Sequence, residues 1–134
     1  MDRPDDRAAA SPDREARFTV GESEFTANRR RLGAFGERVA ASFLERNGVR
    51  VIERNIRIGR GEVDLLAADR SGRFVVEVKS GMEMPGEHPR WNFTDRKARQ
   101  VARMARSLGV GRVDLVTVVV GDAGVGVEWH PRVA

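Results

Sequence analysis

The sequence predicts one α/β domain, with a sheet of about five strands flanked by helices. Apolar residues recur at helical spacing in residues 31–47 and 94–108. Short apolar runs typical of strands lie between these two segments and after the second. The predicted order is therefore helix, three strands, helix, two strands, which is typical of an α/β domain.

The composition favours one domain in a reducing compartment. The chain has 134 residues, of which 40% are hydrophobic, enough for one modest core. Cysteine is absent, which excludes disulfides and thiolate sites. The most apolar run, residues 116–120, is far too short to span a bilayer, and the charged first residues do not resemble a secretory signal. We therefore expect a cytoplasmic protein with no membrane partner.

The first 29 residues differ from the rest of the chain. They are rich in Asp, Arg, Ala, Ser and Pro and hold few large apolar side chains, so we predict a disordered tail before a domain of residues 30–134. The formal net charge is +4, and the basic excess lies in the predicted domain. A basic domain favours a polyanionic partner.

The first predicted helix carries one acidic residue at the margin of its apolar stripe. Gly48 follows the helix as a stop signal, and the stripe itself consists of Leu32, Phe35, Val39, Ala40, Phe43 and Leu44. Glu37 falls at the edge of this stripe. Its carboxylate either reaches to water or points into a site beside the sheet.

Residues 61–80 predict a hairpin that brings charged side chains together. With Ser71 and Gly72 as the turn, Asp64 lies opposite Lys79 and Leu66 opposite Glu77. Asp64 and Glu77 are then diagonal neighbours, roughly 5 to 8 Å apart. These charges directly follow an apolar run, residues 74–76, so they are partly desolvated. Either they form an Asp–Lys ion pair with Glu77 at a wet strand end, or they bind a metal ion.

Basic residues gather in two places. Arg57 and Arg60 lie near the start of the Asp64 strand, where they either hold a phosphate or are ordinary surface arginines. On the second helix a basic stripe follows the outer face and includes Arg96, Lys97, Arg99, Arg103 and Arg106. A stripe of one sign repels itself, whereas opposite a phosphate backbone it gains from counterion release. The stripe therefore favours a nucleic-acid surface over a merely solvated helix.

The remaining segments are less informative. Residues 81–93 predict a loop in which Trp91 and Phe93 either stack on bases or, as we favour, pin the loop to the body. His88 and His130 lack the spacing of zinc ligands. Residues 111–120 and 125–129 predict two strands, with Trp129 in the core.

Four local motifs together resemble the YraN family of small, poorly characterised bacterial proteins and, more widely, the restriction-endonuclease-like PD-D/ExK nucleases. The motifs are Leu32–Glu37, Glu53–Arg57, Gly61–Leu66 and Phe74–Lys79. The closing Val127–His130 is also similar to the end of that family, so the resemblance covers residues 31–134. It implies a central mixed sheet in the order α-β-β-β-α-β-β. The sequence departs from the family pattern at two places. Val63 stands where the PD-D/ExK motif has its proline, and Ser80-Gly81 follows Lys79 where many relatives have Thr-Arg.

The resemblance extends to archaeal Holliday-junction resolvases and implies a site. By this analogy Mg²⁺ or Mn²⁺ is bound by Asp64, Glu77 and the Val78 carbonyl, and Glu37 completes the coordination shell of the ion. Lys79 orients a water or stabilises charge on the phosphate. The function implied is a metal-dependent DNA endonuclease acting on branched or structured DNA, with DNA preferred to RNA and a homodimer as one option. The alternative is a non-catalytic nucleic-acid-binding protein on the same scaffold.

Overall fold

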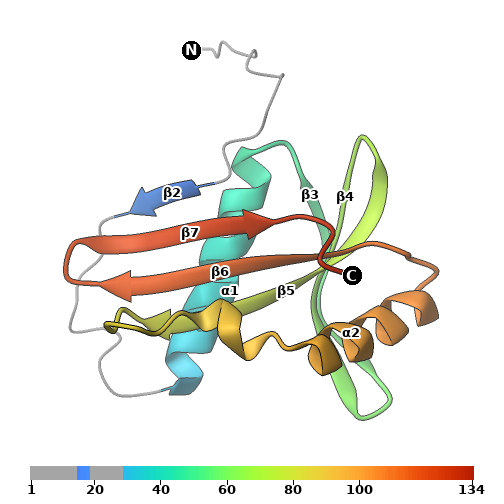
Figure 1. Ribbon diagram of the computed structural model, residues 1–134. Helices are drawn as coiled ribbons and strands as arrows, with labels where there is room; N and C mark the ends of the chain where they lie inside the picture. Colours follow the sequence, from blue (N-terminus) through green and yellow to red (C-terminus); the bar gives the residue numbers. More distant parts are fainter. Residues whose placement is uncertain (1–14, 19–28) are drawn as a thin grey trace, which may run out of the picture.

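The computed structural model describes residues 15–18 and 29–134 and has the predicted α/β class, with helices flanking a mixed sheet (Figure 1). The helices are α1 (Arg29–Arg46), the short 3-10 helix η2 (Pro89–Asn92) and α2 (Asp95–Ser107). The strands are β2 (Glu15–Phe18), β3 (Arg50–Ile58), β4 (Gly61–Asp69), β5 (Gly72–Met82), β6 (Val113–Gly121) and β7 (Gly124–His130).

The sheet has six strands in the order β2-β7-β6-β5-β4-β3. Neighbouring strands are antiparallel except for the parallel pair β5 and β6. The expected count of about five strands is wrong, because β2 pairs along β7 from Glu15↔Glu128 to Phe18↔Val125. This strand lies within the segment predicted as a disordered tail. Residues 1–14 and 19–28 of that segment lie outside the described residues.

The two main helices cover opposite faces of the sheet, with α1 behind it and α2 and η2 in front in the view of Figure 1. Helix α1 comes close to β5, because a Cβ on Gly36 would collide with the Ser80 hydroxyl. The predicted cap of α2 is confirmed, since Thr94 Oγ1 accepts a hydrogen bond from Lys97 N at 3.2 Å. In the described part of the chain, no helix is long and apolar enough to cross a membrane.

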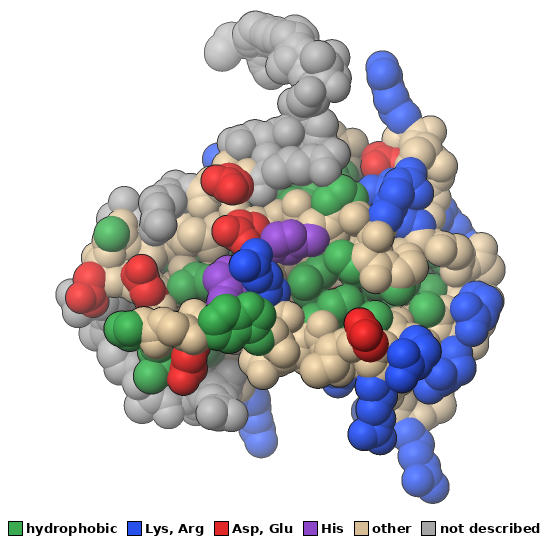
Figure 2. Space-filling view, in the orientation of Figure 1, with side chains coloured by type: hydrophobic (Ala, Val, Ile, Leu, Met, Phe, Trp, Pro, Cys, Tyr) green, Lys and Arg blue, Asp and Glu red, His purple; other side chains and the backbone are tan. Residues whose placement is uncertain are grey.

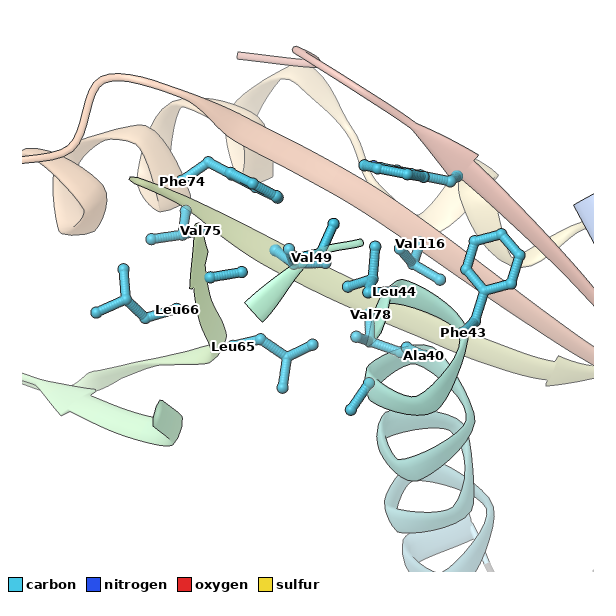
Figure 3. Close-up of a cluster of buried hydrophobic side chains, with 14 of the residues drawn as sticks. Ala40, Phe43, Leu44, Val49, Leu65, Leu66, Phe74, Val75, Val78 and Val116 are labelled. Carbon is cyan, nitrogen blue, oxygen red and sulfur yellow. The ribbon is translucent and has the colours of Figure 1, made fainter. Parts of the chain in front are cut away.

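The core lies between α1 and the central strands (Figure 3). Helix α1 contributes Ala40, Phe43 and Leu44, and the alternation of strands β4 to β6 supplies Leu65, Val78 and Val116. Trp129 on β7 is buried as predicted, and its ring meets that of Phe43 edge to face at 6.3 Å between centroids. Burial on both faces of β5 explains the continuous apolar run before Glu77.

A charged network fixes one end of the sheet. Asp114 is fully buried and accepts hydrogen bonds from Arg112 Nε and Nη2, from Trp129 Nε1 and from the backbone N–H of Arg132. Arg112 also reaches Asp69 and Ser71 in the β4–β5 turn and covers the Phe74 ring at 3.9 Å. Strands β4, β5, β6 and β7 are thereby tied together.

Candidate active site

Asp64 and Glu77 face each other across the β4–β5 hairpin. The paired register ends at Leu65↔Val76, and one further step places Asp64 opposite Glu77. The prediction that Asp64 lies opposite Lys79 is therefore wrong by two residues. A shift of two residues leaves each side chain on its own face of the sheet, so the two carboxylates still share one patch.

The turn explains this shift. Asp69 Oδ1 accepts hydrogen bonds from the backbone N–H of Ser71 at 2.8 Å and from its hydroxyl at 2.7 Å. Gly72 pairs with Asp69 and takes a φ of +119°, which glycine tolerates. The turn residues are consequently Arg70 and Ser71, not Ser71 and Gly72.

Asp64 lies in a setting that disfavours its charge. Burial is the main cause that raises its pKa to about 8, and the charges of Glu77 and Glu37 raise it further. The backbone N–H of Val78 donates to Asp64 Oδ2 at 2.8 Å and, with the charge of Lys79, opposes that rise. A carboxyl with such a pKa keeps its proton at neutral pH unless a cation takes the place of the proton.

Glu77 is also buried, with 7% of its surface exposed. Burial raises the pKa of Glu77, and the charges of Lys79 and Lys97 oppose this rise. Lys79 Nζ lies 3.5 Å from Glu77 Oε2, so the ion pair of the patch joins these two residues and not Asp64 and Lys79. Because Lys97 is on α2, that helix contributes a second positive charge beside the carboxylates.

Asn55 is a site residue that the side-chain pattern of the sequence did not reveal. It lies on β3 between Arg54, which pairs with Leu65, and Ile56, so it is level with Asp64. Its Nδ2 donates to Glu37 Oε1 at 2.9 Å. Its φ of +52° is uncommon for a residue other than glycine, and asparagine is among the few that adopt it. The available signal was an asparagine in the middle of a predicted strand, where that residue is disfavoured.

The oxygen donors suit a hard divalent cation. Within one strand residue the N–H and C=O point to the same side, so the Val78 carbonyl faces the Asp64 side with its N–H. With Asp64 and Glu77 this gives oxygen donors only, and Mg²⁺ is commonly held by one or two carboxylates plus substrate phosphates. Among the residues that the structure describes, no three His, Cys, Asp or Glu side chains form a group that could hold a metal ion. Glu37 therefore does not close a three-carboxylate cage in this arrangement.

The predicted basic residues lie close to this hairpin and on α2. A Cβ on Gly61 would collide with Met104 of α2, so the β3–β4 turn that carries Arg60 packs against that helix. Five of the six predicted nucleic-acid contacts are exposed and Lys97 is half-buried; the exposed ones are Arg57, Arg60, Arg96, Arg99 and Arg103. Figure 2 shows blue Lys and Arg side chains along the side of the molecule where α2 lies.

The predictions for the loop aromatic residues and the histidines have mixed outcomes. Trp91 is 59% exposed, so the expectation that it pins the loop is wrong, whereas Phe93 packs against the core. His88 and His130, far apart in sequence, both lie beside Glu128. This cluster is separate from Asp64 and Glu77 and is described below.

One solved structure shows a slight likeness to the chain. It is the structure of Pyrococcus furiosus SfsA in complex with Ca²⁺, with a TM-score of 0.34 and 17% sequence identity, covering 78% of this chain and 64% of that one.

Curated relatives match over most of the chain. A UPF0102 protein of Chlorobaculum parvum is 34% identical over 68% of this chain and 77% of its own length. Those of Beutenbergia cavernae and Streptomyces coelicolor are 38% and 37% identical over 75% of this chain, and over 92% and 85% of their own lengths. The family model matches residues 36–118, which include Glu37, Asp64, Glu77 and Lys79. The chain belongs to the uncharacterised protein family UPF0102, the YraN family that its motifs resemble.

Proposed function

We propose that this protein is a metal-dependent DNA endonuclease that hydrolyses phosphodiester bonds, with branched or structured DNA as its substrate. The observation that supports the proposal is the pair of half-buried Asp64 and buried Glu77, in which the pKa of Asp64 is raised to about 8 and Lys79 lies beside Glu77. A strained pair of carboxylates next to a lysine is typical of a catalytic centre. The preference for DNA and for a restriction-endonuclease-like fold rests on the motif resemblance.

Each residue has a part in the proposed reaction. Asp64, Glu77 and the Val78 carbonyl would hold Mg²⁺ or Mn²⁺, which supplies Lewis-acid polarisation of the scissile phosphodiester. Lys79 either orients the attacking water or neutralises charge that develops on the phosphate. Glu37, held by Asn55, adds negative charge beside Asp64 and so favours a cation there.

The basic residues would bind the DNA backbone. Arg57 and Arg60 lie at the β3–β4 turn, and Arg96, Lys97, Arg99 and Arg103 lie on α2, which packs against that turn. Contacts of this kind fix the position of the duplex without reading its sequence. The proposed substrate is therefore recognised by shape and charge, which fits structured DNA.

The test is a cleavage assay with Mg²⁺ or Mn²⁺ on linear, nicked, flapped and four-way DNA. We expect wild-type protein to cut at least one structured substrate, and Lys79→Ala to lower the rate by about 100-fold or more. Arg38→Ala, which removes an exposed cation from α1 on the other face, is the matched control and should cut normally. The proposed endonuclease activity would be excluded if all four kinds of DNA stay intact, or if Lys79→Ala cuts as fast as wild type.

The second candidate is a nucleic-acid-binding protein without catalysis. The observation that it rests on is the set of exposed arginines on α2 and at the β3–β4 turn, which needs no metal ion to bind a phosphate backbone. This candidate predicts binding without divalent ions that weakens in salt. The double variant Arg99→Ala with Arg103→Ala should then lower the slope of the log of the binding constant against the log of the salt concentration by about 2. Asp64→Asn should leave binding unchanged, as should the control double variant Arg38→Ala with Arg46→Ala. DNA binding that requires Mg²⁺ and Asp64 contradicts this candidate.

A further inference from the structure

A polar hollow lies over β6 and β7, on the face of the sheet that carries Asp64 and Lys79. Its floor is formed by Thr117 and Val119 of β6 and by Gly126–Glu128 of β7, and one wall is β2 with Glu15 and Ala16. The opposite wall is the segment after β5, with Glu83, Met84, Glu87 and His88. Its volume is about 490 Å³, within the range of small-molecule sites.

Two buried polar atoms of the floor, Thr117 Oγ1 and Glu128 Oε1, have no hydrogen-bond partner among the described residues. Thr117 is fully buried, and its hydroxyl has no hydrogen-bond partner among the described residues although it lines the hollow. An unpaired buried hydroxyl costs free energy, so such a group indicates a missing partner. The neighbour of Thr117 on β5 is Lys79, whereas its neighbour on β7 is Glu128.

Two histidines hold Glu128 from one side. His88 Nε2 lies 3.5 Å and His130 Nε2 lies 3.3 Å from the same oxygen, Glu128 Oε1. His88 Nδ1 accepts from the backbone N–H of Arg90, so in its neutral form His88 carries its proton on Nε2, toward Glu128. Neither contact is a hydrogen bond, since Glu128 Oε1 has no hydrogen-bond partner among the described residues. Figure 2 shows both histidines, in purple, on the front face with acidic side chains beside them.

The lining selects for positive charge. Four glutamates line the hollow and no lysine or arginine does, on a chain whose formal net charge is +4. General attraction of cations to this basic protein is therefore weak, and any cation that binds must be held locally. Apart from His88, the ionisable side chains of the lining are all carboxylates, which repel an anion.

The size and the apolar lining favour an organic cation over a metal ion. The side chains of Met84 and Val119 give the hollow aliphatic surface between its carboxylates, whereas Ala16 and Val127 line it from strands on which their side chains face the core. A bare ion would leave most of about 490 Å³ to water. In the part of the chain that the structure describes, His88, Glu128 and His130 are not a group that could hold a metal ion.

We propose that this hollow binds a small aliphatic polyamine. Ammonium groups would pair with Glu128 and with the glutamates of the walls, while the methylene chain lies on Val119 of the floor. Thr117 would accept a hydrogen bond from one ammonium group. The site is independent of the proposed nuclease chemistry, because none of Glu37, Asp64, Glu77 and Lys79 lines it.

The test is calorimetric titration of the full chain with spermidine, without nucleic acid or divalent ions. Wild-type protein should bind one equivalent of spermidine and should not bind triethylene glycol, a neutral chain. Glu128→Gln should weaken the affinity about tenfold or more, because it removes a partly buried partner of the ammonium group. Thr117→Val should weaken it several-fold. The matched control, Glu53→Gln, lies on the exposed side of β3 at the other edge of the sheet and should bind as wild type does.

The proposal is overturned if wild-type protein does not bind spermidine, or if Glu128→Gln and Glu53→Gln bind spermidine equally well. It is also overturned if the protein binds Zn²⁺ tightly, loses that binding in Glu128→Gln, and does not bind spermidine. Melting curves of each variant show whether it is folded. If Glu128→Gln loses spermidine binding but still cleaves DNA, the polyamine site and the proposed nuclease site are independent of each other.

Discussion

At the scale of single residues, Asp64 shows most clearly how burial creates a candidate site. Its pKa rises from 3.8 to about 8 because β4 and β5 withdraw it from water beside Glu77. Between these two pH values the folded protein holds a proton that the unfolded chain has lost, so stability falls as pH rises through the window. The metal-free fold therefore carries a strain that vanishes when the charge is removed.

Asp64→Asn should relieve this strain. Without divalent ions we expect its melting temperature to exceed that of wild type by about 5 °C at about pH 9, with a smaller gain at about pH 5, where wild-type Asp64 is already protonated. Calorimetric melting across the pH range measures this. Asp122→Asn, in the exposed β6–β7 turn, is the control and should show no such trend. A gain that does not depend on pH would contradict the raised pKa of Asp64.

The sequence alone pointed to Asp64, Glu77 and Lys79 as candidate site residues, because charged side chains next to apolar strand residues can be recognised without a structure. It missed the pairing of Asp64 with Glu77, since the hydrogen bonds from Ser71 to Asp69 that shift the turn depend on side-chain geometry. Asn55 was missed for a similar reason. Its role depends on a positive φ and on a contact with a helix 18 positions away.

At the scale of elements, the helices and strands followed the sequence closely. Apolar spacing and stop signals predicted α1 and α2 nearly to their ends, because each element buries one regular stripe. Strand β2 was not predicted, since it has four residues and depends on hydrogen bonds to the edge of β7. A partner strand elsewhere in the chain leaves no periodic trace in a segment this short.

The approach of α1 to β5 gives a prediction for two glycines of one helix. Gly36→Ala should destabilise the fold by about 1–3 kcal/mol, because the new Cβ meets the Ser80 side chain. Gly33→Ala is the matched control: nothing lies within 4 Å of its Cβ, so it should stabilise the helix by about 0.5–1 kcal/mol. Urea unfolding measures both. Equal effects would show that α1 does not sit this close to the sheet.

At the scale of the whole molecule, the network around Asp114 holds four strands together, and Asp114 pairs with Val76, the residue before Glu77. Arg112→Ala leaves the fully buried Asp114 without its ionic partner and should cost about 3–5 kcal/mol. Arg73→Ala removes an exposed arginine that donates to Leu108 O, and should cost less than about 1 kcal/mol. Chemical denaturation compares the two variants. A small cost for Arg112→Ala would mean that Asp114 is solvated.

The network around Asp114 could not be predicted from sequence patterns. Arg112, Asp69 and Trp129 come from separate elements, and their convergence depends on the strand order β7-β6-β5-β4. The cluster of His88, Glu128 and His130 is brought together by the same order. Spacing along the last strand places Glu128 and His130 on one face, but only the fold brings His88 from the segment after β5 to join them.

The proposed nuclease requires Asp64 and Glu77 to hold one divalent cation together. Anomalous diffraction from crystals of the protein soaked in Mn²⁺ would locate such an ion. We expect one strong peak within about 2.5 Å of oxygens of both carboxylates and of the Val78 carbonyl, absent in Asp64→Asn. No peak between Asp64 and Glu77, or a peak only beside His88 and His130, would contradict it.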